Sequence, residues 1–499
     1  MVLALPCVLL AMDLTVLHLA VPALSASLKP SSAQLLWIVD IYGFLIAGSL
    51  ITMGTLGDRI GRRRLLLIGA AAFGAASALA AFSKSAEMLI ATRALLGVAG
   101  ATLMPSTLAL IRNMFHEPRQ RTTAVAVWLN SFMVGTAIGP LLGGAMLEHF
   151  WWGSVFLLNV PVMALLLLLG PFLLPENRDP NAGKLDLFSV GLSLVAMLSV
   201  VYAIKRAAQD GLDVIVAVAA VTGVSLAVVF IRRQSRLSDP LIDLRLFEVP
   251  AFTASICTQL VALTALAGIY LFTAQYMQLV LGMSPLRAGL WMLPWTISGM
   301  IASMLTPAIA RRIKPAYVMS AGLVVAAVGM IVLTRISEGP GLTLMLLSFV
   351  ITPAGINPTM TLTTDMIMTV APPDRAGAAS AISETSCELG LSLGMAILGS
   401  VGAASYRGIM AKNLTGVSTE VGESARSTLG AAIAAADGLG GQLGANLTAT
   451  ARNAFAQSLE VIAAIAAVMV VIMAIAVVVL LRGVTPSPSA GESDYSAAA

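Results

Sequence analysis

The chain has 499 residues, of which 58% are hydrophobic and 11% charged, and its mean hydropathy is +0.91. This composition excludes a soluble protein, because globular domains carry about 25% charged residues. The net charge of +4 comes from basic residues scattered among short loops, which excludes nucleic acid as a partner. Three cysteines without a CxxC pair and no glycine-rich phosphate loop indicate neither a disulfide framework, a metal site nor a nucleotide site. We expect a membrane protein that is not an enzyme and carries no cofactor.

Fourteen apolar runs follow one another, separated by short polar loops. They are too long and uniformly apolar for barrel strands, so the sequence predicts an all-α polytopic membrane protein. The predicted crossings cover residues 2–24, 34–53, 65–82, 86–111, 122–147, 151–174, 187–204, 214–231, 251–281, 285–309, 316–334, 342–370, 378–404 and 457–481. With both termini in the cytoplasm most Lys and Arg fall in inner loops, as the positive-inside rule requires, and Lys205 falls in an outer loop.

Short loop motifs recur in the second half of the chain at a constant offset, Pro118 and Arg121 matching Pro372 and Arg375. A shared offset predicts two homologous six-helix bundles, at residues 1–174 and 251–481, with a linker pair of helices at residues 187–231. Coincidence between short basic loops is the alternative. Residues 406–456 form the one long loop, whose Ala-rich stretches predict an external helical hairpin, with disorder as the competing interpretation. Residues 485–499 are predicted to be a disordered cytoplasmic tail.

Among the ionisable side chains inside predicted crossings, five stand out as candidates: Asp13, Asp40, Arg93, Glu384 and Glu388. Such groups cost several kcal/mol in lipid unless they face a cavity or a partner, so each is a candidate for proton coupling or cation binding. Glu384 and Glu388 are four residues apart and share a helical face, where their mutual repulsion favours binding of a proton or a cation. The alternative is that the acids form interhelical ion pairs, with Arg93 as the partner.

A basic turn, GTLGDRIGRRR at residues 54–64, combines glycines that permit a tight turn with one acid and several arginines. The acid can face a helix N-terminus and the arginines can hold carboxylates across an interface, which predicts a conformational latch between two moving halves. The latch residues are Gly54, Asp58, Arg59, Gly61, Arg62 and Arg63. A plain positive-inside anchor is the alternative.

The fifth crossing contains GTAIGPLLGG at residues 135–144, which places small residues at i, i+4 and i+8 beside a proline. A helix of this kind can bend and pack closely against a neighbour, although a simple packing seam would also explain its glycines. The residues of this motif are Gly135, Gly139, Pro140, Gly143 and Gly144.

These segments together resemble the major facilitator superfamily, and within it the fourteen-helix drug:proton antiporters that include quaternary-ammonium and methyl viologen resistance exporters. Residues 13–22 resemble that family's first-helix motif, residues 54–64 its loop motif and residues 135–144 its antiporter motif. Leu89, Arg93, Gly97 and Gly100 are similar to a fourth-helix motif associated with proton coupling. The second half matches more loosely, and Gly299 stands where some relatives carry a further acid.

The resemblance implies a major facilitator fold of 14 transmembrane helices (6+2+6) in a bacterial inner or plasma membrane. It implies a proton-coupled antiporter, acting as a monomer in membrane lipid, that exports lipophilic cationic drugs, dyes and antiseptics by alternating access. Quaternary ammonium compounds, ethidium and viologens are the expected substrates, and the proton gradient is the expected driving force.

In this interpretation Asp13 and the Glu384/Glu388 face compensate the charge of the substrate. Four aromatic residues are candidates for stacking on it: Tyr42, Trp128, Trp291 and Trp295. The nearer alternative is an exporter of an endogenous metabolite or antibiotic on the same fold. The distant one is a membrane receptor that does not transport.

Overall fold

The computed structural model describes residues 2–115, 117–176, 186–237, 240–370, 376–414 and 418–481. Among them, thirteen helical segments are long and apolar enough to cross a membrane, and the bent α1 makes fourteen. The predicted all-α class and number of crossings are therefore confirmed, whereas the orientation of the termini stays a prediction. The predicted tail at residues 485–499 lies outside the described residues.

The helices of the first half and the linker are α1 (Leu5–Leu28), α2 (Ser32–Ile60), α3 (Arg62–Ala81), α4 (Ala86–Met114), α5 (Pro118–His149), α6 (Ser154–Leu157), α7 (Asn159–Leu173), α8 (Leu187–Asp210) and α9 (Val214–Gln234). Those that follow are α10 (Pro250–Gln275), α11 (Pro285–Trp291), α12 (Leu293–Ala310), α13 (Pro315–Leu333), α14 (Gly341–Val370), α15 (Ala376–Asn413), α16 (Thr419–Ser427), α17 (Leu429–Leu439) and α18 (Gly441–Leu481). Three short helical turns adjoin these helices. Val2–Ala4 precedes α1, Leu244–Glu248 precedes α10, and Tyr276–Val280 continues α10.

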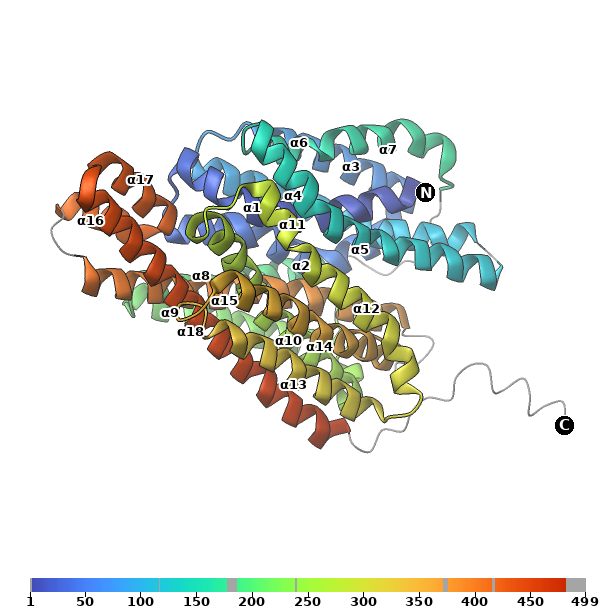
Figure 1. The fold of residues 1–499 in the computed structure, drawn as a ribbon. Coiled ribbons are helices and arrows are strands. Elements are labelled where there is room, and N and C mark those ends of the chain that lie inside the picture. The colour runs from blue at the N-terminus through green and yellow to red at the C-terminus, as the bar shows by residue number, and fades with distance from the viewer. Residues whose placement is uncertain are drawn as a thin grey trace.

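The two longest helices, α15 and α18, contain 38 and 41 residues. At 1.5 Å per residue they are about 57 and 61 Å long, roughly twice the ~30 Å hydrocarbon thickness. Both extend toward the end of the molecule that carries α16 and α17, which we call the hairpin end (Figure 1). Most described residues of the loop predicted at residues 406–456 are thus helical, with breaks between α15, α16, α17 and α18. The side of the membrane on which it lies stays a prediction.

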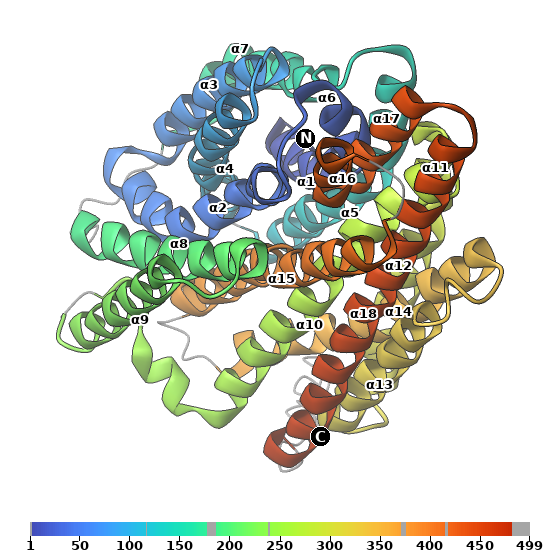
Figure 2. The ribbon, with the colours of Figure 1, turned by 90° about the vertical axis from the view of Figure 1, so that its left-hand side faces the viewer.

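The two six-helix sets repeat one packing pattern. In the first, α1 packs on α5, α2 on α4 and α3 on both α4 and α7. In the second, α10 packs on α15, α12 on α14 and α13 on both α14 and α18. We call them the first half (α1–α7) and the second half (α10–α15 with α18), and Figure 2 shows them as the upper and lower parts of the molecule.

Glycine makes the equivalent close contact in each half. A Cβ atom at Gly135 on α5 would lie 2.3 Å from the carbonyl oxygen of Val8 on α1. A Cβ atom at Gly394 on α15 would lie 2.3 Å from the carbonyl oxygen of Thr264 on α10. No residue type other than glycine permits two helix backbones to approach so closely. Gly135 and Gly394 therefore set the spacing of the α1–α5 pair and the α10–α15 pair.

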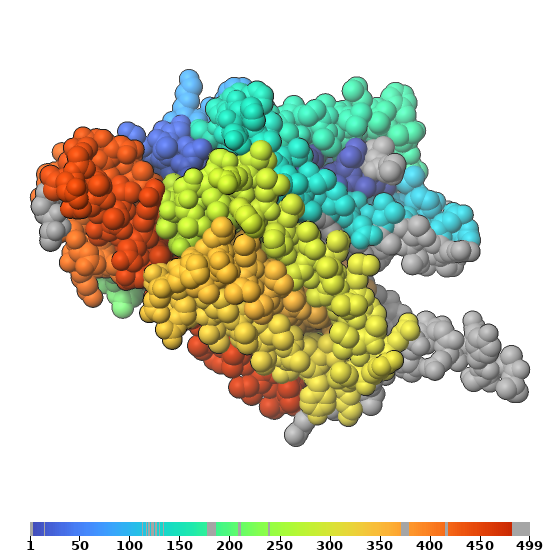
Figure 3. Space-filling model, in the orientation of Figure 1, coloured from blue at the N-terminus to red at the C-terminus, as the bar shows by residue number. Residues whose placement is uncertain are grey.

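The halves meet through α2 with α15, α5 with α11 and α1 with α10. A polar contact between them lies toward the hairpin end, where the Gln278 side chain donates to the carbonyl oxygen of Leu19 (3.0 Å). At the same end, the Ser32 hydroxyl on α2 donates to the carbonyl oxygen of Ser427 on α16. Toward the opposite end, which carries the turn between α2 and α3, the helices of the halves diverge, as Figures 1 and 3 show. We call that end the basic end.

Candidate functional site

Asp13 and Arg93 form an ion pair among the helices of the first half. The Arg93 Nη1 atom lies 2.6 Å from the Asp13 Oδ2 atom, and the two side chains are 1% and 4% exposed. The Asn159 amide on α7 donates to the other Asp13 oxygen at 3.2 Å and to the Ser77 hydroxyl on α3 at 3.2 Å. Both carboxylate oxygens of Asp13 therefore have a donor, and four helices contribute to the cluster.

A bend in α1 places Asp13. The helix changes direction by 40° between Asp13 and Thr15. The Thr15 hydroxyl donates back to the carbonyl oxygens of Ala11 (3.3 Å) and Met12 (3.0 Å), a pattern that bends helices. Gly139 on α5 provides the room, because a Cβ atom there would lie 2.1 Å from the Thr15 hydroxyl oxygen.

The Arg93 guanidinium is held from several sides. Its Nε atom donates to the carbonyl oxygen of Ile38 on α2 at 3.2 Å, and its Cζ atom lies 4.3 Å from the centroid of the Tyr42 ring. Phe156 supplies a second aromatic face at 6.0 Å. Tyr42, proposed as a substrate-stacking residue, is fully buried and packs on Arg93.

Asp40 has a partner that the sequence did not suggest. The Lys205 ammonium lies 2.8 Å from the Asp40 Oδ1 atom and 3.7 Å from the centroid of the Trp37 ring. The placement of Lys205 in an outer loop was wrong, because α8 continues beyond residue 204 to Asp210 and buries this side chain. The second oxygen of Asp40 is buried without a hydrogen-bond partner.

Glu384 and Glu388 lie on α15, and both are half-buried. The Glu388 Oε2 atom is buried without a hydrogen-bond partner. Across the interface, Glu384 lies within electrostatic range of Cys7 on α1, and Glu388 within range of Tyr42 on α2. The carboxylate pair of the second half therefore faces the α1–α2 side of the first half, where the Asp13–Arg93 pair lies.

The three predicted tryptophans lie in different surroundings. Trp128 is buried on α5 and donates from its indole nitrogen to the Thr107 hydroxyl at 3.0 Å. Trp295 packs edge-on against Tyr270 and Phe349 in the second half. Trp291 is 37% exposed at the end of α11. Trp128 and Trp295 thus have packing partners of their own in this conformation.

The turn predicted to be a latch lies between α2 and α3. Asp58 and Arg62 form an ion pair at 2.5 Å. Gly61 has a φ of +110°, a conformation that favours glycine, and a Cβ atom there would collide with the Glu176 carboxylate. Gly54 faces Pro105 on α4.

Arg63 connects this turn to the end of α7. Its backbone N–H donates to Glu176 at 3.1 Å, and its guanidinium donates to the carbonyl oxygens of Pro171 (3.3 Å) and Leu174 (3.1 Å). In this conformation these contacts of the turn stay within the first half. The role of a latch between halves, like that of Arg59, stays a prediction.

The glycine motif of α5 has two faces. Gly135, Gly139 and Gly143 face α1, where added Cβ atoms would lie 2.1 to 2.6 Å from its atoms. Pro140 and Gly144 face the second half, and a Cβ atom at Gly144 would lie 2.7 Å from the backbone of α11. The motif therefore combines the close α1–α5 contact with a contact between the halves.

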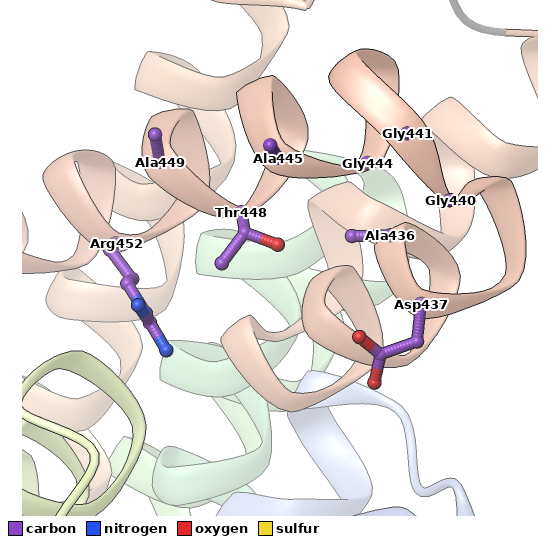
Figure 4. Close-up of a pocket in the computed structure, with 9 residues that line it drawn as sticks. All are labelled: Ala436, Asp437, Gly440, Gly441, Gly444, Ala445, Thr448, Ala449 and Arg452. Carbon is purple, nitrogen blue, oxygen red and sulfur yellow. The ribbon is translucent and has the colours of Figure 1, made fainter.

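A cavity of about 500 Å³ lies at the hairpin end, between α17 and the start of α18 (Figure 4). Asp437 and Arg452 are the charged residues of its lining, and glycines form the turn between the two helices. Arg452 also donates to the carbonyl oxygen of Leu279 at 2.9 Å, which connects α18 to the end of α10. Thr448 is a further polar residue of the lining.

Asn159, Lys205 and His18 are among the buried polar residues that the sequence did not single out. The His18 ring contacts Tyr270 edge-on at 5.2 Å, and its Nδ1 atom has no partner. Each is a polar residue in or directly beside an apolar run, and that was the available signal.

Comparison with known proteins identifies the class. A model of the Major Facilitator Superfamily matches residues 3–395, so the chain belongs to this family of membrane transporters and is not an enzyme. The multidrug efflux pump LfrA of Mycolicibacterium smegmatis is 45% identical over 96% of this chain and 95% of its own length. The methyl viologen resistance protein SmvA of Salmonella typhimurium is 36% identical over 93% of this chain and 94% of its own length.

Among solved structures, a bacterial homologue of the human lysosomal transporter Spinster, in an inward-facing and unoccupied conformation, has the same fold. Its TM-score is 0.69 at 18% identity, with 96% of each chain covered.

Proposed function

We propose that this transporter is a proton-coupled antiporter that exports lipophilic cationic drugs, dyes and antiseptics across a bacterial inner membrane. The similarity to LfrA and SmvA over nearly the whole chain supports drug efflux. The observation that carries the substrate class is the α15 carboxylate face, where Glu388 has a buried oxygen without a partner. An unpaired carboxylate in a low-dielectric interior favours a cation or a proton and disfavours an anion.

The Asp13–Arg93 pair is the proposed coupling element. A proton that reaches Asp13 neutralises the carboxylate and releases Arg93 from its ion pair. The freed positive charge then opposes a bound cation on the facing α15 side. Proton entry and cation release are thereby linked through one guanidinium, which is the requirement for exchange.

Charge balance makes the proposal specific. Exchange of one proton for one monovalent cation moves no net charge, so the pH gradient drives it and the membrane potential does not. Exchange of one proton for a dication moves one charge, which is worth ~2.3 kcal/mol at 100 mV. A second proton, carried by another of the acids, would restore neutrality.

Ethidium efflux from membrane vesicles tests this function, first with an imposed pH gradient and then with the gradient collapsed by an ionophore. We expect efflux that needs the gradient and is insensitive to an imposed potential. If folded protein moves neither ethidium nor any other lipophilic cation, the cationic substrate class is wrong, and a dedicated metabolite exporter becomes the better interpretation. Efflux that persists without a pH gradient would instead refute proton coupling.

A further inference from the structure

The linker helix α8 lies against both halves at once. It packs on α2 of the first half and on α15 of the second, which form one of the helix pairs through which the halves meet. Figure 2 shows α8 beside α2 and α15, with α9 on its outer side. When the two halves change their angle, a helix in this position can stay with one half, with the other, or with neither.

Toward the first half, α8 makes a directional and charged contact. The Lys205 ammonium lies between the Asp40 carboxylate and the face of the Trp37 ring, and both partners are on α2. Asp40 is fully buried, and the Lys205 side chain is 2% exposed. Separation of this pair would leave an uncompensated charge in a low-dielectric interior, so it resists any movement of α8 along α2.

Toward the second half, α8 presents apolar side chains. Leu198 and Val201 pack in one cluster with Leu389, Leu393 and Ala396 of α15, and the same cluster includes Trp37 and Phe44 of α2. The contacts to α15 are apolar, whereas those to α2 include the Lys205–Asp40 ion pair as well. Apolar contacts are non-directional, and one register can replace another at little cost as long as the area stays covered. The two faces of α8 therefore differ in how readily they allow sliding.

Ion pairs join the two linker helices, α8 and α9, at both ends. Arg206 near the end of α8 pairs with Asp213 at the start of α9 at 2.9 Å, and Arg233 near the end of α9 pairs with Asp186 at the start of α8 at 3.0 Å. Hydrogen bonds from Arg206 hold the pKa of Asp213 below its ordinary value, so that carboxylate is charged at neutral pH. Because α8 and α9 also pack on each other, the two helices form one unit.

From these contacts we infer that Lys205 fastens the α8–α9 pair to the first half, so that the pair moves with that half while α15 slides across α8. Lys205 is then a positioning residue, and Asp40 acts as its anchor. The inference rests on the alternating access in the proposed function, because it assigns the linker to one of the two moving bodies.

Distances between spin labels test the assignment in the full-length protein in vesicles, with the native cysteines replaced. Three exposed positions carry the labels in pairs: Ile68 on α3, Val221 on α9 and Val328 on α13. A change from alkaline to acidic pH, with and without ethidium, switches the conformation. We expect the 68–328 and 221–328 distances to change and the 68–221 distance to stay the same.

Each other outcome is informative. A constant 221–328 distance with a changing 68–221 distance would place the linker on the second half and overturn the inference. Changes in all three distances would mean that the linker belongs to neither half, which also overturns it. An unchanged 68–328 distance would show that the halves do not rock, and alternating access itself would then fail together with the inference.

Variants of the ion pair test the anchor. Lys205→Met should broaden the 68–221 distance distribution and lower the maximal efflux rate roughly tenfold, with little change in the substrate concentration for half-maximal rate. Asp40→Lys combined with Lys205→Asp should restore both, because the attraction is re-formed in reverse. Lys412→Met, on the exposed end of α15, is the matched control. Wild-type distances and rate in Lys205→Met would overturn the anchoring role, whether or not the double variant folds.

Discussion

The two halves of the transporter share a backbone arrangement and differ in how they hold their acids. In the first half, Asp13 lies against Arg93 and Asp40 against Lys205 of the linker. In the second half, Glu388 has no ion pair among the described residues, and one of its oxygens is buried without a hydrogen-bond partner. The glycine contacts between α1 and α5 and between α10 and α15 are nevertheless equivalent. The repeated packing pattern therefore does not require repeated chemistry, and one half can hold its charges in pairs while the other leaves an acid without an ion pair.

Asp13→Asn should have the largest effect on efflux and on stability, because it removes the acid of the Asp13–Arg93 ion pair in the first half. A carboxamide cannot balance the buried Arg93 guanidinium, and an uncompensated buried charge costs about 3–5 kcal/mol. We expect ethidium efflux at the background rate and a lower unfolding temperature. Glu420→Gln, at an exposed position of α16, is the control and should leave both unchanged. Full transport by Asp13→Asn would refute its role in coupling.

Gly135→Ala and Gly394→Ala should lower the stability by equal amounts, each smaller than the loss in Asp13→Asn. The two variants test the packing pattern that the halves share. Each added methyl group would meet a backbone carbonyl oxygen of the neighbouring helix, and overpacking of this kind costs about 1–3 kcal/mol. Thermal unfolding of the purified protein measures the loss. Gly408→Ala is the control, since a Cβ atom there has no atom within 4 Å. A large loss in one half alone would show that the halves are alike in shape but not in energy.

Glu388→Gln should weaken the binding of cationic substrates by the second half. Loss of this charge removes an attraction for a cationic substrate, and a tenfold higher half-saturating concentration corresponds to about 1.4 kcal/mol. A neutral substrate should be unaffected, because it has no charge to compensate. Glu423→Gln on the exposed face of α16 serves as the control. Equal changes for charged and neutral substrates would show that Glu388 shapes the cavity and does not bind charge.

The fold was accessible from the sequence because apolar runs of membrane length can hardly form anything but helices. Each predicted crossing has its counterpart among the helices of the structure. The ends of the helices were harder to predict from the sequence. For example, α18 begins at Gly441, whereas the crossing was predicted from residue 457. An Ala-rich chain can continue a helix beyond the lipid, and hydropathy does not register where the membrane stops.

The candidate site was accessible in its residues but not in its partners. The cost of charge in lipid pointed to Asp13 and Arg93 separately, and their pairing stood as an alternative because it depends on how α1 and α4 pack. The burial of Lys205 beside Asp40 was not predicted, for a related reason. A lysine at the end of an apolar run is ordinarily an interfacial residue, and only the packing of α8 on α2 shows that it is buried beside Asp40.

The smallest effect on stability should come from Asp58→Asn in the turn between α2 and α3. Its ion pair with Arg62 is partly exposed, with Asp58 at 39%, and such pairs contribute about 0–1 kcal/mol. We expect an unfolding temperature close to that of the wild type. Arg64→Gln, at an exposed position of the same turn, is the control.

If the turn is a latch, its effect should appear in the other conformation, because the contacts of Arg63 in this one stay within the first half. Asp58→Asn would then reduce efflux and shift the 68–328 label distances toward one state, and a free energy of 1 kcal/mol changes the ratio of two states about fivefold. Normal efflux and normal distances would make the turn a simple anchor. A loss of stability as large as that of Asp13→Asn would instead place Asp58 among the structural charges of the first half, and the contrast between a paired and an unpaired half would extend to its surface.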